Sequence, residues 1–183
     1  MKPTSECLES QADTAGWLPG LQHIRSPNCD ARPAGVHVDL VVIHAISLPP
    51  AEYGSDAVTD FFCNRLDPDA HPYFAGIATR RVSAHFFIRR DGVTIQFVDC
   101  RDRAWHAGVS CWRGRERCND FSLGIELEGD DANVFAPVQY LALNALLVEL
   151  RKRYPDTEIA GHADIAPGRK TDPGPCFDWA RIA

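Results

Sequence analysis

The sequence predicts a single-domain α/β protein in which helices flank a central β-sheet. Residues 38–46 form a nearly continuous run of apolar and β-branched residues, which is typical of a strand buried on both faces. Residues 122–128 alternate between apolar and polar side chains, and this pattern predicts a second strand. Leucines recur at helical spacing between Pro137 and Pro155, which predicts a long helix with an apolar stripe.

The chain before the first of these strands shows little periodicity. Residues 1–33 carry scattered prolines and glycines, so we expect an irregular N-terminal arm that packs on the domain. Its expected anchors are Trp17, Leu18, Leu21 and Ile24. After the first strand, residues 56–64 are predicted to form a short helix that turns its apolar side chains inward.

The middle of the chain is predicted to contain a hairpin and a long loop. Strands at 83–89 and 94–98 flank the pair Asp91-Gly92, which is a frequent hairpin turn. Residues 105–120 form a polar stretch that is longer than most connections in a compact domain. Loops of that length usually serve binding or catalysis, so we expect a functional segment there.

Composition and charge limit the classes of function. The chain has 183 residues, of which 45% are hydrophobic, and this suits one domain with a sizeable core. Its formal net charge of −6 argues against nucleic-acid binding, because contact with phosphates requires a basic surface. The 7 cysteines are odd in number and form no Cys-x-x-Cys pair, so we expect neither a disulfide framework nor a zinc ribbon.

The N-terminal sequence bears on the location of the protein. Residues 1–16 lack the basic start and the apolar core of a signal peptide. No apolar run reaches membrane-spanning length. We therefore expect a cytoplasmic protein without a membrane partner, in which most cysteines are buried or free thiols.

A short strand at 157–160 is expected to lead into the segment from Gly161 to Pro175, where polar side chains are most concentrated. Its three prolines and three glycines argue against a helix and predict an irregular loop. This loop carries His162, Lys170 and Asp172. Because a proline follows Asp172, we expect extended backbone there, which would turn Lys170 and Asp172 to the same side.

His44, His162 and Asp172 together offer a set of donors suited to catalytic zinc. His44 stands near the end of the first strand, where sites are often found in sheets of this kind. Two imidazoles and a carboxylate would leave one position open for water or substrate. Spacing alone does not select these three residues. Equally available are His71, His85, His106 and Asp164.

Several motifs occur in the order and with the gaps of a known enzyme family. They are VVIHAISLPP at 41–50, RVSAH at 81–85, AWHAG at 104–108, GRERCND at 114–120, GIELEG at 124–129 and the segment 161–175. On these motifs the chain resembles the AmpD-type anhydro-N-acetylmuramyl-L-alanine amidases. The resemblance implies one zinc amidase domain over residues 1–183. It also implies the mixed β-sheet of the amidase fold shared with peptidoglycan-recognition proteins, one Zn²⁺ per chain, and a role in cell-wall recycling.

The resemblance also assigns roles to individual residues. It implies that His44, His162 and Asp172 bind zinc. It implies that Glu126 is the catalytic carboxylate, which moves protons between water and the departing nitrogen, and that Lys170 is the catalytic lysine, which faces the oxyanion. Residues expected to contact the substrate are Tyr73, Arg81, Trp105, Arg117 and Leu127. The chain departs from the family at Ala45, where the family typically has asparagine, so substrate positioning is in question at that corner.

The expected function is hydrolysis of the amide between the lactyl group of the anhydromuramyl sugar and L-alanine. The expected partner is a small anhydromuropeptide, and we expect a monomer. Two alternatives stay open at this stage. One is a module of the same fold that binds muropeptide without cutting it, although all three proposed zinc ligands are present. The other is an exported wall amidase, which the absence of an export signal disfavours.

Overall fold

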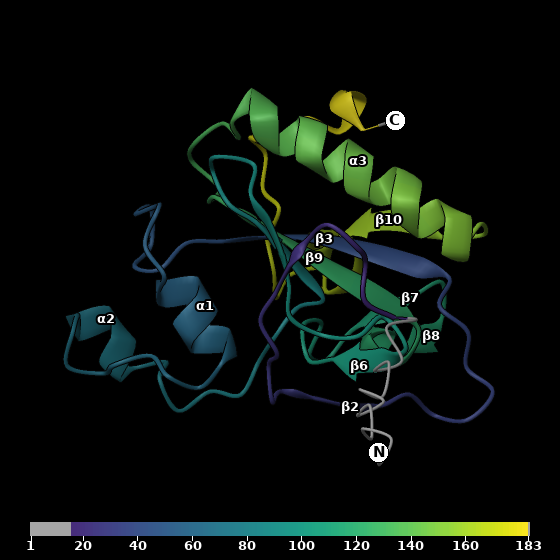
Figure 1. Ribbon diagram of the computed structural model, residues 1–183, viewed down its shortest axis with the longest axis horizontal. Coiled ribbons are helices and arrows are strands. Elements are labelled where there is room, and N and C mark those ends of the chain that lie inside the picture. Colours follow the sequence, from purple (N-terminus) through teal and green to yellow (C-terminus); the bar gives the residue numbers. More distant parts are fainter. Residues whose placement is uncertain (1–15, 183) are drawn as a thin grey trace, which may run out of the picture.

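The computed structural model describes residues 16–182, and its centre is a six-stranded mixed β-sheet (Figure 1). Strands β4 and β5 pair antiparallel, while the other neighbours pair parallel. In order across the sheet the strands are β1 (Gln22–His23), β5 (Thr94–Gln96), β4 (Phe86–Ile88), β9 (Ser122–Glu128), β3 (Leu40–Ile46) and β10 (Glu158–Gly161). The expected α/β class and mixed sheet are confirmed.

The two longest strands, β3 and β9, lie side by side in the interior of the sheet and pair over their whole length. Residues 40–44 of β3 and every residue of β9 are buried. A strand that is covered on both faces must be apolar at nearly all positions, and this explains the continuous run that predicted β3. The polar positions of β9 are therefore buried too, and not solvated edge residues.

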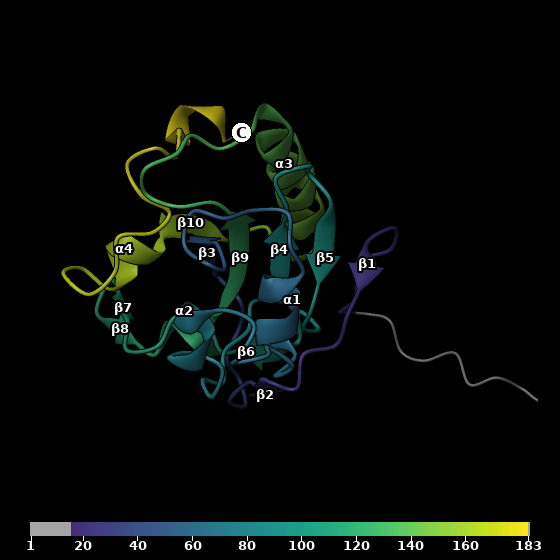
Figure 2. The same cartoon turned by 90° about the vertical axis from the view of Figure 1, so that its left-hand side faces the viewer.

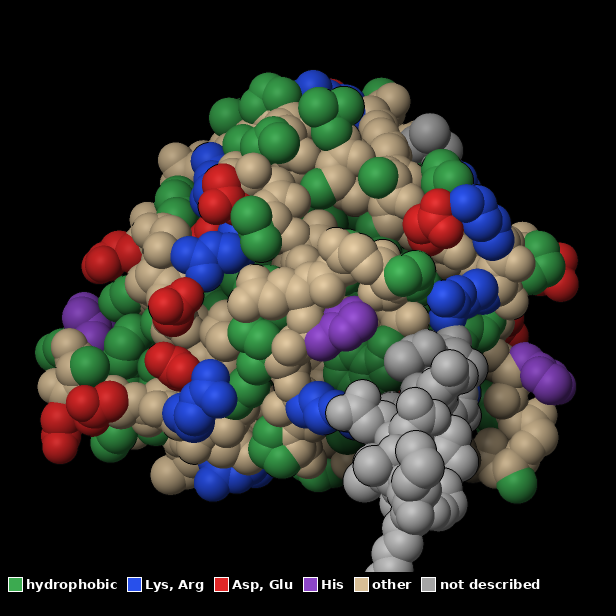
Figure 3. Space-filling model, viewed as in Figure 1, with side chains coloured by type: hydrophobic (Ala, Val, Ile, Leu, Met, Phe, Trp, Pro, Cys, Tyr) green, Lys and Arg blue, Asp and Glu red, His purple; other side chains and the backbone are tan. Residues whose placement is uncertain are grey.

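Helix α3 (Pro137–Arg153) covers one face of the sheet, as Figure 2 shows. Its stripe of Leu143, Leu146, Leu147 and Leu150 is buried against side chains of β3, β4 and β9. The prediction of a core-packing leucine stripe is confirmed. On its outer side α3 leaves hydrophobic side chains at the surface among charged ones (Figure 3), including Leu141, which is 70% exposed.

The opposite face of the sheet is covered by shorter elements. Helix α1 (Ala57–Phe62) packs its phenylalanines into a second apolar cluster. Helix α2 (Pro72–Ala75) lies beside it in Figure 2, on the side of the sheet away from α3. Two small antiparallel pairs complete this side, and they join β2 (Cys29–Ala31) to β6 (Asp102–Ala104) and β7 (Cys111–Trp112) to β8 (Arg115–Glu116).

Two segments are more regular than the sequence predicts. The N-terminal arm contributes strands β1 and β2, because its backbone finds partners in β5 and β6 that local sequence cannot reveal. Trp17 and Leu18 of the arm are buried, as expected, and residues 1–15 lie outside the described part. The loop after Gly161 begins with one helical turn, α4 (His162–Ile165), so the prediction of a wholly irregular loop is wrong there. Its prolines all lie beyond that turn.

Smaller features complete the description. The 105–120 loop holds the β7–β8 pair and the 3-10 turn η1 (Cys118–Asp120), and a second 3-10 turn, η2 (Trp179–Arg181), lies near the C-terminus. The six cysteines within residues 16–182 are free thiols. Over the same residues, no helix has the length and apolar character needed to cross a membrane.

Candidate metal centre

Strand register brings the candidate residues together. In the parallel pair of β3 and β9, His44 lies directly opposite Glu126. In the parallel pair of β10 and β3, Gly161 lies opposite Ile43, so the next residues of the two strands, His162 and His44, leave the sheet at the same level. Two histidines that are 118 residues apart in the sequence thus meet at one end of the sheet.

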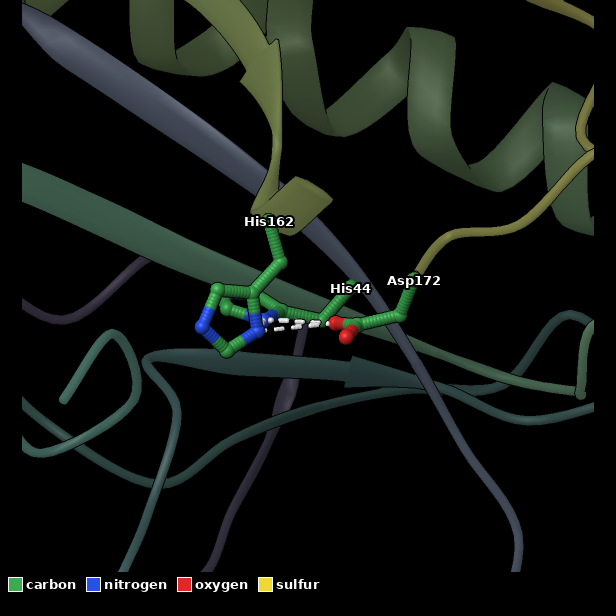
Figure 4. Close-up of side chains that lie close together, drawn as sticks. All are labelled: His44, His162 and Asp172. Atoms are coloured by element: carbon green, nitrogen blue, oxygen red, sulfur yellow. Dashed lines mark hydrogen bonds and ion pairs between the residues drawn. The ribbon is translucent and has the colours of Figure 1, made fainter. Parts of the chain in front are cut away.

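His44, His162 and Asp172 point at one another (Figure 4). The Nδ1 atoms of the two histidines are 2.9 Å apart. Asp172 Oδ2 lies 2.9 Å from His162 Nδ1 and 3.1 Å from His44 Nδ1. Within residues 16–182, these three form the one group of at least three His, Cys, Asp or Glu side chains with a geometry that could hold a metal ion. The convergence expected of this set is confirmed.

The other histidines and the aspartate that spacing left available are engaged elsewhere. His71 caps α2, because its Nδ1 accepts the Tyr73 N–H. His85 Nδ1 accepts the N–H of Gly124, and burial, followed by the charge of Arg32, lowers the pKa of His85 to about 3. Asp164 accepts the N–H of Gly161. His106 Nδ1 lies within hydrogen-bond distance of His44 Nε2, the ring nitrogen that points away from Asp172.

The proton positions around these donors suit a cation. The carbonyl oxygen of Ala107 can only accept, so its 3.1 Å contact, which is shorter than the 3.5 Å contact of Arg169 Nη2, gives a proton on His162 Nε2 a partner and frees Nδ1 when a cation lies between it and Asp172. Burial lowers the pKa of His44 to about 4, although Asp172 opposes the shift, so His44 is neutral near pH 7. Asp172 supplies the carboxylate, whose Oδ2 faces the Nδ1 atoms of both rings.

Two ring nitrogens and a carboxylate oxygen therefore crowd together within hydrogen-bond distance. Such donor atoms repel one another unless a proton or a cation lies between them. Two imidazoles and one carboxylate are the ligand types of catalytic zinc sites that keep an open position. The residues present fit a zinc ion on this ground.

Glu126 is a buried carboxyl group beside this set. Its Oε1 lies 4.0 Å from His44 Nδ1, and among the described residues no group donates a hydrogen bond to its Oε2. Burial, followed by the charge of Asp172, raises the pKa of Glu126 well above its usual range, and Lys170 opposes this shift. A group with a raised pKa and an unsatisfied oxygen at a cavity wall has the character of a general base.

A cavity of about 670 Å³ opens beside this set. Its wall includes Glu126, His162, Lys170 and Asp172, so two of the proposed ligands and both proposed catalytic groups share one space, while His44 is buried and does not line it. Ala45 lines it too, which places the position where the chain departs from the family at the cavity itself.

The five residues expected to contact the substrate lie in different environments. Tyr73 lines the cavity and is 43% exposed. Arg81 and Trp105 do not line it, and Trp105 Nε1 donates to Asp30 instead. Arg117 lines a neighbouring hollow of about 510 Å³. Leu127 is fully buried, because strand alternation turns its side chain to the α3 face, away from Glu126, so its side chain does not line the cavity.

Sequence reasoning gave no role to some residues at the cavity. Asp130, Asp131 and Arg169 line it. Arg169 also donates to the carbonyl oxygens of Ala107 and Val109, at 2.7 and 2.6 Å, and so joins α4's loop to the 105–120 loop. In the sequence, the position of Arg169 in the polar 161–175 segment was the one feature that indicated a role for it.

The chain is similar to known cell-wall amidases. Residues 34–175 match the family described as N-acetylmuramoyl-L-alanine amidase. The 1,6-anhydro-N-acetylmuramyl-L-alanine amidase AmpD of Citrobacter freundii is 54% identical over 169 residues, which are 91% of this chain and 90% of that protein.

Solved structures agree with the sequence matches. A crystal structure of a Se-Met AmpD derivative aligns with a TM-score of 0.89 and 54% identity, over 91% of this chain and 94% of that one. AmiD from E. coli, solved in complex with the substrate anhydro-N-acetylmuramic acid-L-Ala-D-gamma-Glu-L-Lys, aligns with a TM-score of 0.57 and 30% identity. That alignment covers 82% of this chain and 58% of AmiD. The expected amidase fold is confirmed.

Proposed function

Because the chain belongs to the N-acetylmuramoyl-L-alanine amidase family and is an amidase of the AmpD type, we propose that it hydrolyses anhydromuropeptides. The proposed bond is the amide between the lactyl group of 1,6-anhydro-N-acetylmuramic acid and L-alanine. The observation that carries this proposal is the convergence of His44, His162 and Asp172 beside Glu126, at the wall of one cavity that His162, Asp172 and Glu126 line.

His44, His162 and Asp172 would hold one Zn²⁺ per chain. Zinc bound by such ligands supplies polarisation of a carbonyl and lowers the pKa of water from 15.7 to about 7. The preference for zinc over other divalent ions is supported by the mixture of imidazole and carboxylate donors and by the family. The protein itself contributes the positions of the three donor atoms and the groups that surround them.

Glu126 is proposed to act as the general base and then as the general acid. Its raised pKa means that it holds a proton strongly once it has taken one from the attacking water. The same carboxyl group can then deliver that proton to the departing amide nitrogen. Burial keeps it away from bulk water, so the proton is passed on within the site.

Lys170 is proposed to stabilise the oxyanion of the tetrahedral intermediate. Lys170 lines the same cavity, and its positive charge is close enough to influence the pKa of both Glu126 and His44. A preorganised donor at such an oxygen typically lowers the barrier by roughly 3 to 4 kcal/mol. Substrate contacts of Tyr73, Arg81, Trp105 and Arg117 are proposed on the resemblance alone.

We also propose that the enzyme acts in the cytoplasm on small soluble muropeptides, in peptidoglycan recycling, and as a monomer. The free thiols of the six described cysteines are consistent with a reducing compartment. The AmpD relative that matches 91% of the chain supports a small anhydro-sugar substrate over the polymeric wall.

An assay with two substrates tests the proposal. Soluble anhydromuropeptide and intact sacculi are each incubated with purified protein, before and after treatment with a chelator. The recycling amidase should release peptide from the soluble substrate, cut sacculi poorly, and regain lost activity when zinc is returned. Binding without release would indicate a muropeptide-binding module, and preference for sacculi would indicate a wall amidase.

A further inference from the structure

His106 and Ala107, which are consecutive residues of the 105–120 loop, contact the two histidine ligands His44 and His162. His44 Nε2 lies 2.9 Å from His106 Nδ1, and His162 Nε2 lies 3.1 Å from the carbonyl oxygen of Ala107. In both rings this is the nitrogen that points away from Asp172, because each Nδ1 faces that carboxylate. The segment 106–107 therefore contacts both imidazoles of the centre.

A chain of polar groups fixes the direction of the hydrogen bond between His44 and His106. Ser122 Oγ donates its one hydrogen to the carbonyl oxygen of Cys118, at 2.6 Å. At its 3.2 Å contact with His106 Nε2, the hydroxyl oxygen must then accept. A neutral His106 with its proton on Nε2 has a bare Nδ1, which accepts from His44 Nε2 and leaves His44 Nδ1 bare.

The backbone of this segment is itself anchored. Asn119 Oδ1 accepts from the backbone N–H groups of both His106 and Ala107, at 3.1 and 2.8 Å. The half-buried Arg32 donates through its guanidinium to the carbonyl oxygen of Asn119 at 3.0 Å and to that of Ser122 at 2.9 Å. One asparagine side chain thus sets the backbone that presents both the His106 ring and the Ala107 carbonyl.

Gly124 leaves room for the His106 ring against the sheet. A Cβ at Gly124 would lie 2.5 Å from His106 Cγ and 2.7 Å from its Nδ1. The glycine stands on β9, two residues before Glu126, where strand alternation turns it to the same face. The space that it leaves is filled by the ring that contacts His44.

We propose that His106 and Ala107 form an outer clamp of the metal centre, in which each fixes the proton of one histidine ligand on Nε2 so that its Nδ1 is bare for the cation. His106 is thus a positioning residue, which acts on the cation through His44. Partners of this kind typically change metal affinity by roughly 10- to 100-fold when they are removed. The inference rests on the metal binding of the proposed function.

Replacing His106 tests the clamp. His106→Leu fills the space without an acceptor, whereas His106→Asn can place an amide oxygen near the position of Nδ1. His37→Leu makes the same chemical change at an exposed histidine and serves as the control. The zinc affinity of the whole chain is measured by competition with a chromogenic chelator. We expect His106→Leu to weaken it by about 10- to 100-fold, His106→Asn to recover most of the loss, and His37→Leu to leave it unchanged.

A second measurement needs no variant. Long-range ¹H–¹⁵N spectra of the zinc-loaded wild-type protein report which ring nitrogen carries the proton and which one faces the metal. We expect Nε2–H in both His44 and His162. A proton on Nδ1 of either ring would overturn the proposal, as would a folded His106→Leu variant that binds zinc as tightly as the wild type.

Gly124→Ala displaces the ring without changing any histidine. Gly76→Ala is its control, because a Cβ there meets only the carbonyl oxygen of Tyr73, at 3.6 Å. We expect weaker zinc binding in Gly124→Ala alone, and equal affinity in a folded Gly124→Ala variant would contradict the clamp. If the wild-type protein itself bound no zinc, the proposed function would fail; equal binding by wild type and the folded His106→Leu variant would remove only the clamp.

Discussion

His44 and Glu126 are direct neighbours across the parallel pair of β3 and β9, with Nδ1 and Oε1 4.0 Å apart. Both strands are buried along most of their length, so this separation is set by backbone register rather than by flexible side chains. A shift of one residue in either strand would turn one of the two groups to the α3 face. The proposed ligand and the proposed base therefore lie on the two longest strands of the sheet, which pair along their whole length.

Glu126→Gln should retain zinc and lose most turnover. The amide matches the carboxylate in shape but cannot take a proton from water, so a loss of about 10²- to 10⁴-fold in kcat is expected. Glu128→Gln is the matched control two residues along β9. Glu128 accepts the N–H groups of Gly54 and Arg90, so its change should lower thermal stability and leave the chemistry in place. Near-normal turnover of Glu126→Gln would move the base to another residue.

The stability of the metal-free protein should depend on pH through Glu126. Burial, and then the charge of Asp172, raises its pKa well above the usual value of 4.5, so the folded state holds this proton more tightly than the unfolded state. The resulting stabilisation is fully present below about pH 4.5 and is lost as the pH rises through the raised pKa. Metal-free Glu126→Gln should lose less stability than wild type over that range. Thermal unfolding of both proteins measures this, and parallel curves would contradict it.

Lys170→Ala should lower turnover without changing the zinc content. Loss of an oxyanion donor is expected to reduce kcat by about 10²- to 10³-fold. Lys152→Ala removes the same group from the exposed surface of α3, where Lys152 pairs with Glu149, and should have no effect on the rate. Steady-state kinetics and metal analysis of both variants provide the comparison. An unaltered rate in Lys170→Ala would exclude the lysine from the mechanism.

Leu146→Ala should destabilise the fold and leave the chemistry of the folded fraction intact. Leu146 is buried between α3 and the sheet, so its removal should cost about 2 to 5 kcal/mol in the free energy of unfolding. Leu141→Ala, on the exposed side of the same helix, should change that free energy by less than about 0.5 kcal/mol. Urea unfolding of both variants measures the difference. Similar values for the two would contradict the packing of α3.

Local patterns were sufficient for the long elements of the fold. The leucine stripe of α3 has the period of a helix, and the continuous apolar run of β3 is typical of a strand that is buried on both faces. Strands β1 and β2 could not be predicted, because each is only two or three residues long and depends on partners from β5 and β6. The turn that carries His162 was missed because the prolines nearby dominate the local sequence, although they all follow it.

The prediction of the site residues depended on the resemblance to a known family more than on the spacing of these residues in the sequence. His44, His162 and Asp172 meet through register between strands far apart in the sequence, and no local pattern contains that register. Leu127 shows a limit of predicting contacts from the resemblance. Its position in a motif suggested a substrate contact, while the two-residue period of β9 places it on the α3 face. The role proposed for His106 could not be predicted from the sequence, because it depends on the contacts of its two ring nitrogens with His44 and Ser122.

The zinc content of purified Asp172→Ala is the most direct test of the central claim. Asp172 is the one anionic member of the proposed ligand set, and both imidazoles converge on its Oδ2. Wild type should carry one zinc per chain by elemental analysis, as should the control Asp156→Ala at an exposed position. Asp172→Ala should stay folded, lose the bound zinc and lose activity. A folded Asp172→Ala variant that keeps one zinc per chain would contradict the proposed centre.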